Sequence, residues 1–379
     1  MKIIIGADLV PTQSNEQLFF ERNVNVLLGK ELTDLLSQAS FKIFNLEVPL
    51  TDAASPIEKC GPALIASPAS VGGIKAIGAN LLTIANNHIL DQGEQGLFST
   101  TELLKSVGID YVGAGADLDA ASKPYIAQIG DKCIGIYACA ENEFSIATTS
   151  SAGANPFDPF ESFDHVASLK GQCDYVIVLY HGGKEHYRYP SPMLQKTCRK
   201  LAEKGADLVI CQHSHCVGCM EEYNGATIVY GQGNFLFDHS ESEFWQTGLL
   251  IETDENFHIE YIPIKKMGNT VRLAVGDDAK NILGGFARRS QQIQVPGFVE
   301  ENYKAFAESM LPLYLFTSSG KNRSLFYRVI NKLTGHKLEK ALLNRRYNGQ
   351  KCLNLQNYIE CEAHRELFLC GLKQKTNRR

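Results

Sequence analysis

The chain has 379 residues, of which 44% are hydrophobic and 21% are charged, and its formal net charge is −5. This composition is ordinary for a globular protein, and the length allows one large domain and a smaller one. The longest apolar runs, such as residues 175–180, fall far short of the roughly 20 residues that cross a bilayer. The sequence therefore excludes a helix-spanning membrane protein and predicts a chain with no transmembrane segment.

The amino terminus and the cysteines bear on cellular location. The opening MKIIIGADLVPT has one lysine and few apolar residues before polar sequence, so it indicates a first strand rather than a signal peptide. The 11 cysteines are scattered through strand-like and helical stretches instead of forming a short disulfide framework. We expect most of them to be reduced, buried thiols in a cytoplasmic protein.

Up to about residue 263, short β-rich runs alternate with helical patterns, which is typical of a layered α/β domain. The first expected strands are KIIIG, FKIFN and NLLTIAN, and the later ones are YVGAG, YIAQI, CIGIYAC, DYVIVLY, DLVICQH, TIVYGQ, GLLIETD and FHIEYIPI. Helices are expected at residues 16–38, 69–77, 94–107, 160–170 and 192–204. The last four strands follow one another quickly, so we expect part of the fold to be antiparallel.

After about residue 268 the pattern changes to that of helices, expected at 296–310, 323–333, 337–345 and 353–372. The charge changes as well: residues 280–379 contain 18 Lys and Arg and 7 Asp and Glu, whereas residues 1–279 contain 19 and 35. We therefore divide the chain into an α/β domain, residues 1–268, and a basic, mainly helical C-terminal region, residues 269–379.

The stretch GADLVICQHSHCVGCM, residues 205–220, offers two kinds of metal ligand. His213 and His215 are two apart after a buried strand, so they can face one point, although histidines at strand ends often only make hydrogen bonds. A closed zinc site wants four ligands, usually two close pairs, and Cys216 with Cys219 is the single C-x-x-C here. We favour the histidines and expect Cys211 in the core.

Polar residues also follow four other expected strands. Since ligands in α/β sheets collect at the carboxyl ends of strands, these segments can converge on one crevice. Each of these residues alone could be a turn, loop or surface residue, but together they share one ligand chemistry. They are Asp8, Asn45, Glu47, Asn86, Asn87, His88, Asp91 and His181.

Carboxylate, amide oxygen and imidazole together suit a centre of two divalent ions of manganese, iron or zinc. In such a centre a shared carboxylate holds both ions and a bridging hydroxide becomes the nucleophile. Glu47 is our candidate for the shared carboxylate. His88 is placed to stay outside the metal ligands and to protonate a leaving group or bind developing charge.

An ordered set of motifs resembles a known family. The segments are FNLEVPLTD, ANNHILDQGEQGL, YVGAGADLDAA, AENEFS, VLYHGGKEHYRYPSP, ICQHSHCVG and IVYGQGNFLFD. In this order they resemble the CapA-type poly-gamma-glutamate capsule-synthesis proteins, which are similar in fold to calcineurin-like metallophosphoesterases. The match covers roughly residues 1–238 and implies a four-layered αββα sandwich with a dinuclear metal site at the strand ends.

The resemblance also implies roles for individual residues. One metal would be bound by Asp8, Glu47 and His215. The other would be bound by Glu47, Asn87, His181 and His213. His88 would be the catalytic histidine, and we place Asp91 with it in catalysis. The side chains expected to orient the ligands are Asn45, Asn86, Glu143, Glu185 and Asn234.

Two departures from the pattern stand out. A typical metallophosphoesterase has a histidine two residues after the first aspartate, where this chain has Val10. Its bridging residue is an aspartate, where this chain has Glu47. By this pattern one metal lacks a ligand, so the sequence does not decide whether both positions fill.

Three functions follow as hypotheses. The first is a metal-dependent hydrolase of capsule or exopolymer biosynthesis, in which hydroxide attacks a phosphate, ester or amide group. The alternative is a non-catalytic metal- or polymer-binding assembly factor of the synthesis complex; an ordinary phosphodiesterase unrelated to capsule is a third. The expected partners are an anionic polymer or a phosphorylated small molecule, and other exopolymer synthesis proteins.

The basic C-terminal region could attract an anionic polymer, dock against the acidic domain or form a solvated face, and we favour the last two. Signatures of nucleic-acid modules are missing from the sequence, so no nucleic-acid partner is expected. VGAGADL has Leu118 in place of the third glycine of a dinucleotide fingerprint, and neither G-x-S-x-G nor G-x-x-x-x-G-K-[ST] occurs. Serine hydrolases and P-loop enzymes are therefore excluded.

Overall fold

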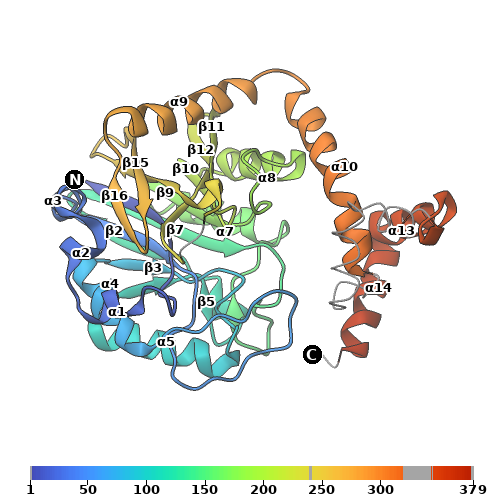
Figure 1. Ribbon diagram of the computed structural model, residues 1–379, viewed down its shortest axis with the longest axis horizontal. Helices are drawn as coiled ribbons and strands as arrows, with labels where there is room; N and C mark the ends of the chain where they lie inside the picture. The colour runs from blue at the N-terminus through green and yellow to red at the C-terminus, as the bar shows by residue number, and fades with distance from the viewer. Residues whose placement is uncertain (1, 239–240, 319–342, 344, 377–379) are drawn as a thin grey trace. The chain divides into compact units, whose positions relative to one another are not determined.

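The computed structural model describes residues 2–238, 241–318, 343 and 345–376. It divides into two compact units, Met1–Val299 and Glu300–Arg379. Figure 1 shows that the first unit is built from β-sheets with helices around them, whereas the second is drawn as helices.

The first sheet has eight strands within the described residues, in the order β16-β15-β14-β1-β2-β3-β4, with β13 also paired to β1. Their bounds are β1 Ile3–Leu9, β2 Phe41–Leu46, β3 Leu81–Thr83, β4 Asp110–Val112, β13 Asn234–Leu236, β14 Thr247–Thr253, β15 Ile259–Met267 and β16 Thr270–Leu273. Strands β1 to β4 run parallel to one another. Strands β14 to β16 are antiparallel, as expected for part of the fold.

The second sheet has six strands in the described part of the chain, in the order β11-β12-β10-β9-β7-β6. They are β6 Tyr125–Ile129, β7 Lys132–Ala140, β9 Tyr175–His181, β10 Leu208–Gln212, β11 Val217–Tyr223 and β12 Ala226–Gln232. The four central strands are parallel, and β6 and β11 at the edges are antiparallel. A small sheet pairs β5 Ala114–Gly115 with β8 Gly153–Ala154.

The two large sheets pack face to face because their strands are apolar on both sides. Ile3 and Ile5 of β1 share one buried cluster with Ile177 of β9, whereas Ile4, which points the other way, belongs to a second cluster. In the same manner Val178 lies in a third cluster with the helices beyond β9. Alternate residues of a strand thus supply the middle and the outer layers of the core.

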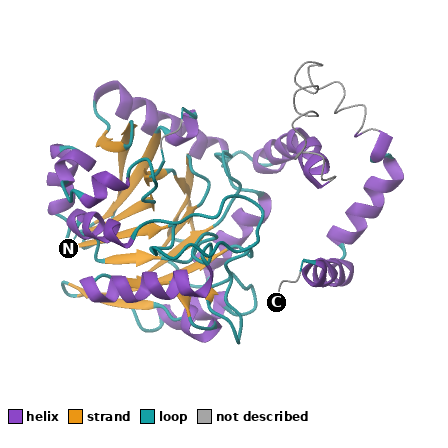
Figure 2. Ribbon diagram, turned by 60° about the horizontal axis from the view of Figure 1, so that its bottom comes forward, coloured by secondary structure: helices purple, strands orange, loops and turns teal. Residues whose placement is uncertain are grey.

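Helices cover both outer faces, as Figure 2 shows. Residues of α1 to α5 share a buried cluster with the first sheet, and residues of α7 and α8 share one with the second. The bounds are α1 Glu16–Phe20, α2 Val24–Leu28, α3 Lys30–Ser37, α4 Val71–Ile77, α5 Gly93–Val107, α6 Leu118–Ala121, α7 Ser162–Lys170 and α8 Pro192–Glu203, with 3-10 helices η1 Pro68–Ser70 and η2 Glu243–Trp245. The predicted four-layered αββα sandwich is confirmed.

Some of the individual helices and strands differ from those expected from the sequence. The helix expected at 16–38 is three short helices, because Arg22 and Gly29 adopt positive φ angles of 54° and 74° that end a helical run. Strands β11, β13 and β16 were not predicted. In β11 the sequence VGCMEEY interrupts apolar residues with two glutamates, one of which, Glu221, is buried by its ion pair with Arg199 at 2.6 Å.

The first unit also extends past the expected boundary at 268. Helix α9, Gly276–Gln292, packs on β11 and β15, and its Phe286 is buried with a ring centroid 4.8 Å from that of Tyr261. The compact unit therefore includes this helix and ends at Val299.

The second unit is helical where it is described. Its helices are α10 Phe298–Ser318, α13 Gly349–Glu360 and α14 Glu362–Lys375. The helix expected at 353–372 is thus two helices that meet at Cys361. The helix expected at 323–333 and most of that at 337–345 lie outside the described residues. Within the described residues, no helix combines the length and apolar character needed to cross a bilayer.

The packing between the sheets makes a stability prediction. Ile177 is fully buried between them, whereas Ile126 on β6 is 48% exposed. Removal of the buried side chain leaves a cavity, so Ile177→Ala should lower the free energy of unfolding by about 2–5 kcal/mol. Ile126→Ala, the matched control, should change it by less than about 1 kcal/mol. Urea denaturation measures both, and equal losses would contradict the two-sheet core.

Candidate metal centre

The polar strand ends converge on one edge of the sandwich. In the first sheet Asp8 of β1 is in register with Asn45 of β2, and Glu47 follows β2. In the second sheet His181 ends β9 beside Gln212, which ends β10 one residue before His213. Parallel strands bring their carboxyl ends to the same edge, and here both sheets do so side by side.

Glu47 lies at the centre of this edge and is completely buried. Its Oε1 is 3.4 Å from Nε2 of His181 and 4.0 Å from Nε2 of His88. Among the described residues, neither carboxylate oxygen has a hydrogen-bond partner. Burial alone raises the pKa of Glu47, but His181, His215 and His88 outweigh burial and hold it well below its usual range. The carboxylate is thus ionised and lacks donors.

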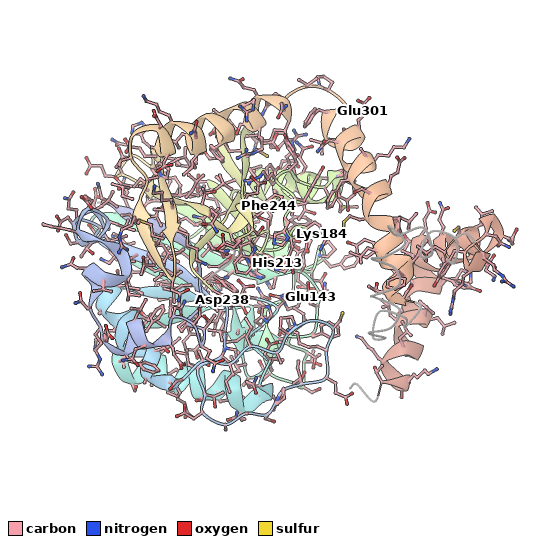
Figure 3. The ribbon with its side chains drawn as sticks, in the orientation of Figure 1. Glu143, Lys184, His213, Asp238, Phe244 and Glu301 are labelled. Carbon is pink, nitrogen blue, oxygen red and sulfur yellow. The ribbon has the colours of Figure 1, made fainter. Side chains whose placement is uncertain are left out.

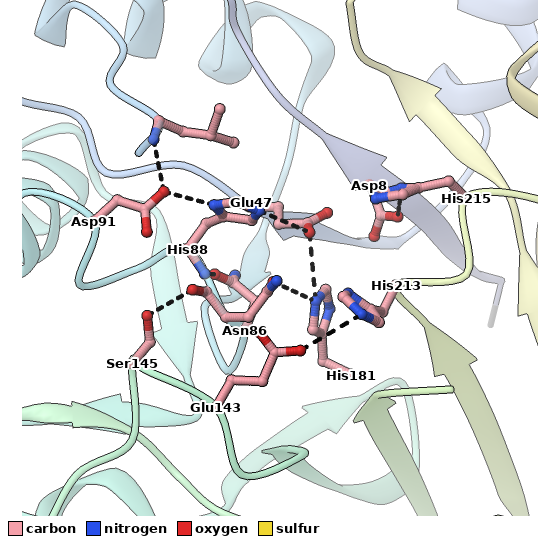
Figure 4. Close-up of polar contacts among 12 residues, drawn as sticks. Asp8, Glu47, Asn86, His88, Asp91, Glu143, Ser145, His181, His213 and His215 are labelled. Atoms are coloured by element: carbon pink, nitrogen blue, oxygen red, sulfur yellow. Dashed lines mark hydrogen bonds and ion pairs between the residues drawn. The ribbon is translucent and has the colours of Figure 1, made fainter. Parts of the chain in front are cut away.

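Two groups of side chains surround Glu47 with the spacing of metal ligands. In each group one ligand atom per residue lies within 4.8 Å of the others. The first group is Asp8, Glu47 and His215, and the second is Glu47, His181 and His213. Figure 4 shows both around Glu47. Oδ1 of Asn87 adjoins the second group, 3.0 Å from Nε2 of His181. The expected ligands therefore meet in two overlapping sets.

His213 and His215 are held by an unusual backbone. Their φ angles are +83° and +53°, a region that non-glycine residues seldom adopt and that clusters at functional sites. Burial and the nearby His181 lower the pKa of His213 well below its usual range. Burial alone would lower the pKa of His215 too, but Asp8 and Glu47 outweigh burial and raise it to about 9. The surroundings thus shift the two pKa values in opposite directions although the residues are two apart.

Two of the side chains expected to orient ligands contact them directly, and a third, Asn86, acts through Asn45. Asn45 donates to Asp8 at 2.8 Å, and Asn86 donates to Asn45 at 3.1 Å. Oδ1 of Asn234 accepts from Nδ1 of His215 at 2.9 Å. These amides form a relay that fixes the carboxylate and the ring.

The two expected glutamates lie farther out. Oε1 of Glu143 is 3.9 Å from Nε2 of His213, and its side chain is 38% exposed. Figure 3 labels Glu143 and His213 within the first unit. Glu185 is exposed and forms a further group with His213 and His215 that has metal-ligand spacing. Either carboxylate could turn toward an ion or toward solvent.

His88 and Asp91 form a buried pair beside the metal ligands. Nδ1 of His88 lies 2.5 Å from Oδ2 of Asp91, and Nε2 faces Glu47. Asp91 is fully buried and also accepts from the backbone N–H of Leu64 at 2.6 Å. The aspartate thus orients the ring, as Figure 4 shows.

A buried lysine in this pair was missed by the sequence analysis. Nζ of Lys59 pairs with Oδ1 of Asp91, and its side chain is only 4% exposed. Its surroundings, SPIEKCGPA, form an irregular loop without periodicity, so nothing in the sequence pointed to this residue.

The remaining departures and alternatives also have structural answers. Val10 is fully buried in the outer core of the first sheet, so no ligand replaces the missing histidine there. Cys211 and Cys219 are core residues, and Cys216 is buried as well. In the described part of the chain, the groups with metal-ligand spacing contain no cysteine. All 11 cysteines are free thiols.

The candidate ligands lie in a segment that matches a known family. The model of the family described as bacterial capsule synthesis protein PGA_cap matches residues 6–239. The chain belongs to this family. The matched segment contains both sets of candidate ligands and the His88–Asp91 pair.

Curated relatives carry related names. The PGA biosynthesis protein CapA of Bacillus subtilis is 31% identical over 173 residues, 45% of each chain. The capsule biosynthesis protein CapA of Bacillus anthracis is 30% identical over 181 residues, 46% of this chain and 44% of that protein. A probable polyglutamine synthesis accessory protein of Mycobacterium tuberculosis is 30% identical over 210 residues, 52% and 55%. The chain spans about half the length of the curated relatives it matches.

A group of aromatic side chains lies beside His215 and combines Phe237 of the matched segment with Trp245 beyond it. Trp245 of η2 lies with its ring centroid 5.0 Å from that of His215 and 4.7 Å from that of Phe237. Lys266 of β15 holds its ammonium 5.6 Å from the Trp245 ring and donates to the carbonyl of Asp238. Burial outweighs the nearby Asp238 and lowers the pKa of Lys266 to about 8.

The Lys266 shift predicts a pH dependence of stability. Between about pH 8 and 10.5 the unfolded chain binds more protons at this lysine than the folded chain, so stability from this group should rise with pH. In Lys266→Met this rise in stability with pH should be absent. The free energy of unfolding of the variant should exceed that of wild type most below pH 8. Chemical denaturation at pH 7 and pH 10 measures the free energy of unfolding. Lys265→Met, at a partly exposed lysine, is the control. A difference between wild type and Lys266→Met that is independent of pH would refute the shift.

Proposed function

We propose that this edge of the sandwich holds two divalent metal ions and hydrolyses a phosphate, ester or amide bond in exopolymer production. Asp8, Glu47 and His215 would bind one ion. Glu47, Asn87, His181 and His213 would bind the other. Glu47 would be shared between the two.

The buried carboxylate of Glu47 is the observation that carries the proposal. An ionised carboxylate without hydrogen-bond donors is costly to bury unless a cation lies close to it. Neutral imidazole, amide oxygen and carboxylate are ligands for manganese, iron and zinc. Two ions on either side of Glu47 would satisfy both of its oxygens, so the residues present fit the metals.

The ligand counts of the two positions differ. The position at Asp8 has three protein ligands because Val10 supplies none, whereas the position at Asn87 has four. The position at Asp8 should therefore be the weaker one. Bound ions would supply an activated water as nucleophile and would neutralise charge in the transition state.

His88 would handle the proton on the leaving group. Its ring is fixed through Nδ1 by Asp91, so Nε2 is the free atom, and it points to the side where Glu47 lies. A histidine so placed can donate a proton to the departing oxygen or nitrogen, which typically contributes about 10²–10⁴ in rate. The amides of Asn45 and Asn234 keep Asp8 and His215 in place during this step.

The setting in exopolymer production is supported by family membership and by the names of the relatives. An anionic polymer or a phosphorylated small molecule is the proposed substrate, and other exopolymer synthesis proteins are proposed partners. Residues 280–379, with 18 basic and 7 acidic side chains, could add attraction for an anionic polymer. The 11 free thiols support the expected cytoplasmic location.

The first prediction from this proposal concerns metal content. Protein purified without chelator and reconstituted with manganese or zinc should hold two equivalents per chain by elemental analysis. His213→Ala/His215→Ala should lose at least one equivalent, because it removes a ligand from each position. His258→Ala, at an imidazole that is 76% exposed, should bind as wild type does. Retention of both equivalents in the double variant would show that the metals lie elsewhere.

The second prediction concerns His88. His88→Ala should keep its metal and lose about 10²–10⁴ in kcat on the metal-loaded protein, because the proton donor is gone while the ligands stay. Release of phenol from phenyl phosphate is a first assay, because so poor a leaving group needs the proton donor. Full hydrolytic activity without His88 would contradict its role as proton donor. Full complementation of exopolymer production in cells without His88 would favour the non-catalytic assembly role.

A further inference from the structure

Lys59 occupies an unexpected place for a lysine. It belongs to residues 51–66, here called the strap, an irregular loop between β2 and η1. Its neighbours Glu58 and Cys60 are exposed, yet its own side chain is 4% exposed. Nζ pairs with Oδ1 of Asp91, donates to the carbonyl oxygen of Asn87 at 3.3 Å and lies 3.3 Å from Nδ1 of His88.

Burial of this ammonium calls for a physical reason. A lysine on an exposed loop can keep its charge in water, and removal of that water is costly unless an opposite charge compensates. The compensating group is Asp91, whose carboxylate is itself fully buried. Each charge would be isolated without the other. The two residues therefore form one unit, although they come from segments 32 positions apart.

The contacts of Asp91 show how this unit acts on His88. Oδ1 accepts from Nζ of Lys59, whereas Oδ2 accepts from Nδ1 of His88 at 2.5 Å and from the backbone N–H of Leu64 at 2.6 Å. Since Nδ1 gives its proton to Asp91 and an ammonium has only donors, Lys59 cannot hydrogen-bond the ring in this state. It acts on the ring through the carboxylate, and it holds the carbonyl of the neighbouring Asn87 directly.

We propose that Lys59 is a positioning residue for the His88–Asp91 pair. It holds the Asp91 carboxylate in the orientation in which Oδ2 accepts the Nδ1 proton of His88, and so keeps Nε2 directed toward the metal side. It also balances the buried negative charge of Asp91, so that His88 need not do so. The consequence for turnover rests on the proposed function, whereas the effect on the ring does not.

A simpler role for Lys59 would be to fasten the strap. A variant of Gln92 distinguishes that role from positioning of the His88–Asp91 pair. Oε1 of Gln92 accepts from the N–H of Ser55 at 2.7 Å, and its Nε2 donates to the carbonyl of Leu64 at 2.9 Å. Gln92→Ala therefore loosens the strap at two points while Lys59 and Asp91 keep their contact. Reaction of the exposed Cys60 with a thiol reagent, located by peptide mass spectrometry, reports how firmly the strap is held.

The deciding experiment observes the His88 ring itself. Histidine-selective ¹⁵N NMR on the zinc-loaded full chain should show a low-field Nδ1 proton that is absent from His88→Gln. The signal should persist in Lys59→Arg and in Gln92→Ala and should be lost in Lys59→Met. Lys59→Gln, without the charge, gives the same test should Lys59→Met not fold. An unchanged signal in an uncharged variant, or its loss in Gln92→Ala, would overturn the proposal.

Turnover gives a second readout. Phenol is a poorer leaving group than p-nitrophenol and needs more help from a proton donor. Lys59→Met should therefore lose about tenfold or more in kcat on phenyl phosphate but under about threefold on p-nitrophenyl phosphate. His88→Ala should show the same preference for the better leaving group, and more strongly. Equal losses on both esters would contradict positioning of the proton donor. If wild type hydrolyses neither ester, the proposed phosphoester reaction fails and the NMR result alone decides the role of Lys59.

Discussion

The site is organised around a buried carboxylate whose oxygens have imidazoles nearby but no hydrogen-bond partner among the described residues. Glu47 is fully buried, ionised, and without a hydrogen-bond partner for either oxygen among the described residues. Such an arrangement would be unfavourable in a protein whose final state contained only these side chains. Three imidazoles, a second carboxylate and an amide oxygen stand around it, and each is a metal ligand by chemistry. Our proposal of divalent cations at Glu47 accounts for this gathering of side chains.

The fold supplies this gathering through two parallel sheets whose carboxyl ends open on the same edge. Asp8 and Glu47 come from the first sheet, and His181, His213 and His215 come from the second. The apolar layer between the sheets sets the distance between these two groups of side chains. The positive φ angles at His213 and His215 are the local cost, and the compact packing of the sandwich offsets it.

Much of this could be predicted because it follows regular patterns. Strand runs ending in Asp8, Glu47 and His181 indicated the edge, and the His-x-His spacing indicated a shared target. The pairing of His215 with Asp8 came from the family resemblance alone, because β10 and β1 lie in different sheets and no periodic pattern links them. The role of Lys59 could not be predicted, because it depends on how an irregular loop folds back on Asp91.

The extent of the first unit shows the same division between regular and irregular signals. Helix α9 was not predicted, because its sequence, GDDAKNILGGFARRSQQ, is largely polar. It is attached by few apolar residues, chiefly Phe286, and by Arg289, which donates to the carbonyl of Gly218 at 2.7 Å. A hydrophobic pattern alone underestimates such a helix.

The central claim is that Glu47 is shared by two metal ions, and anomalous diffraction tests it most directly. Data collected on either side of the zinc absorption edge from crystals of the zinc-loaded chain locate the ions without reference to activity. The account predicts two peaks that flank the Glu47 carboxylate, with the peak at Asp8 and His215 the weaker of the two. A single peak remote from Glu47, or none in zinc-saturated crystals, would contradict it.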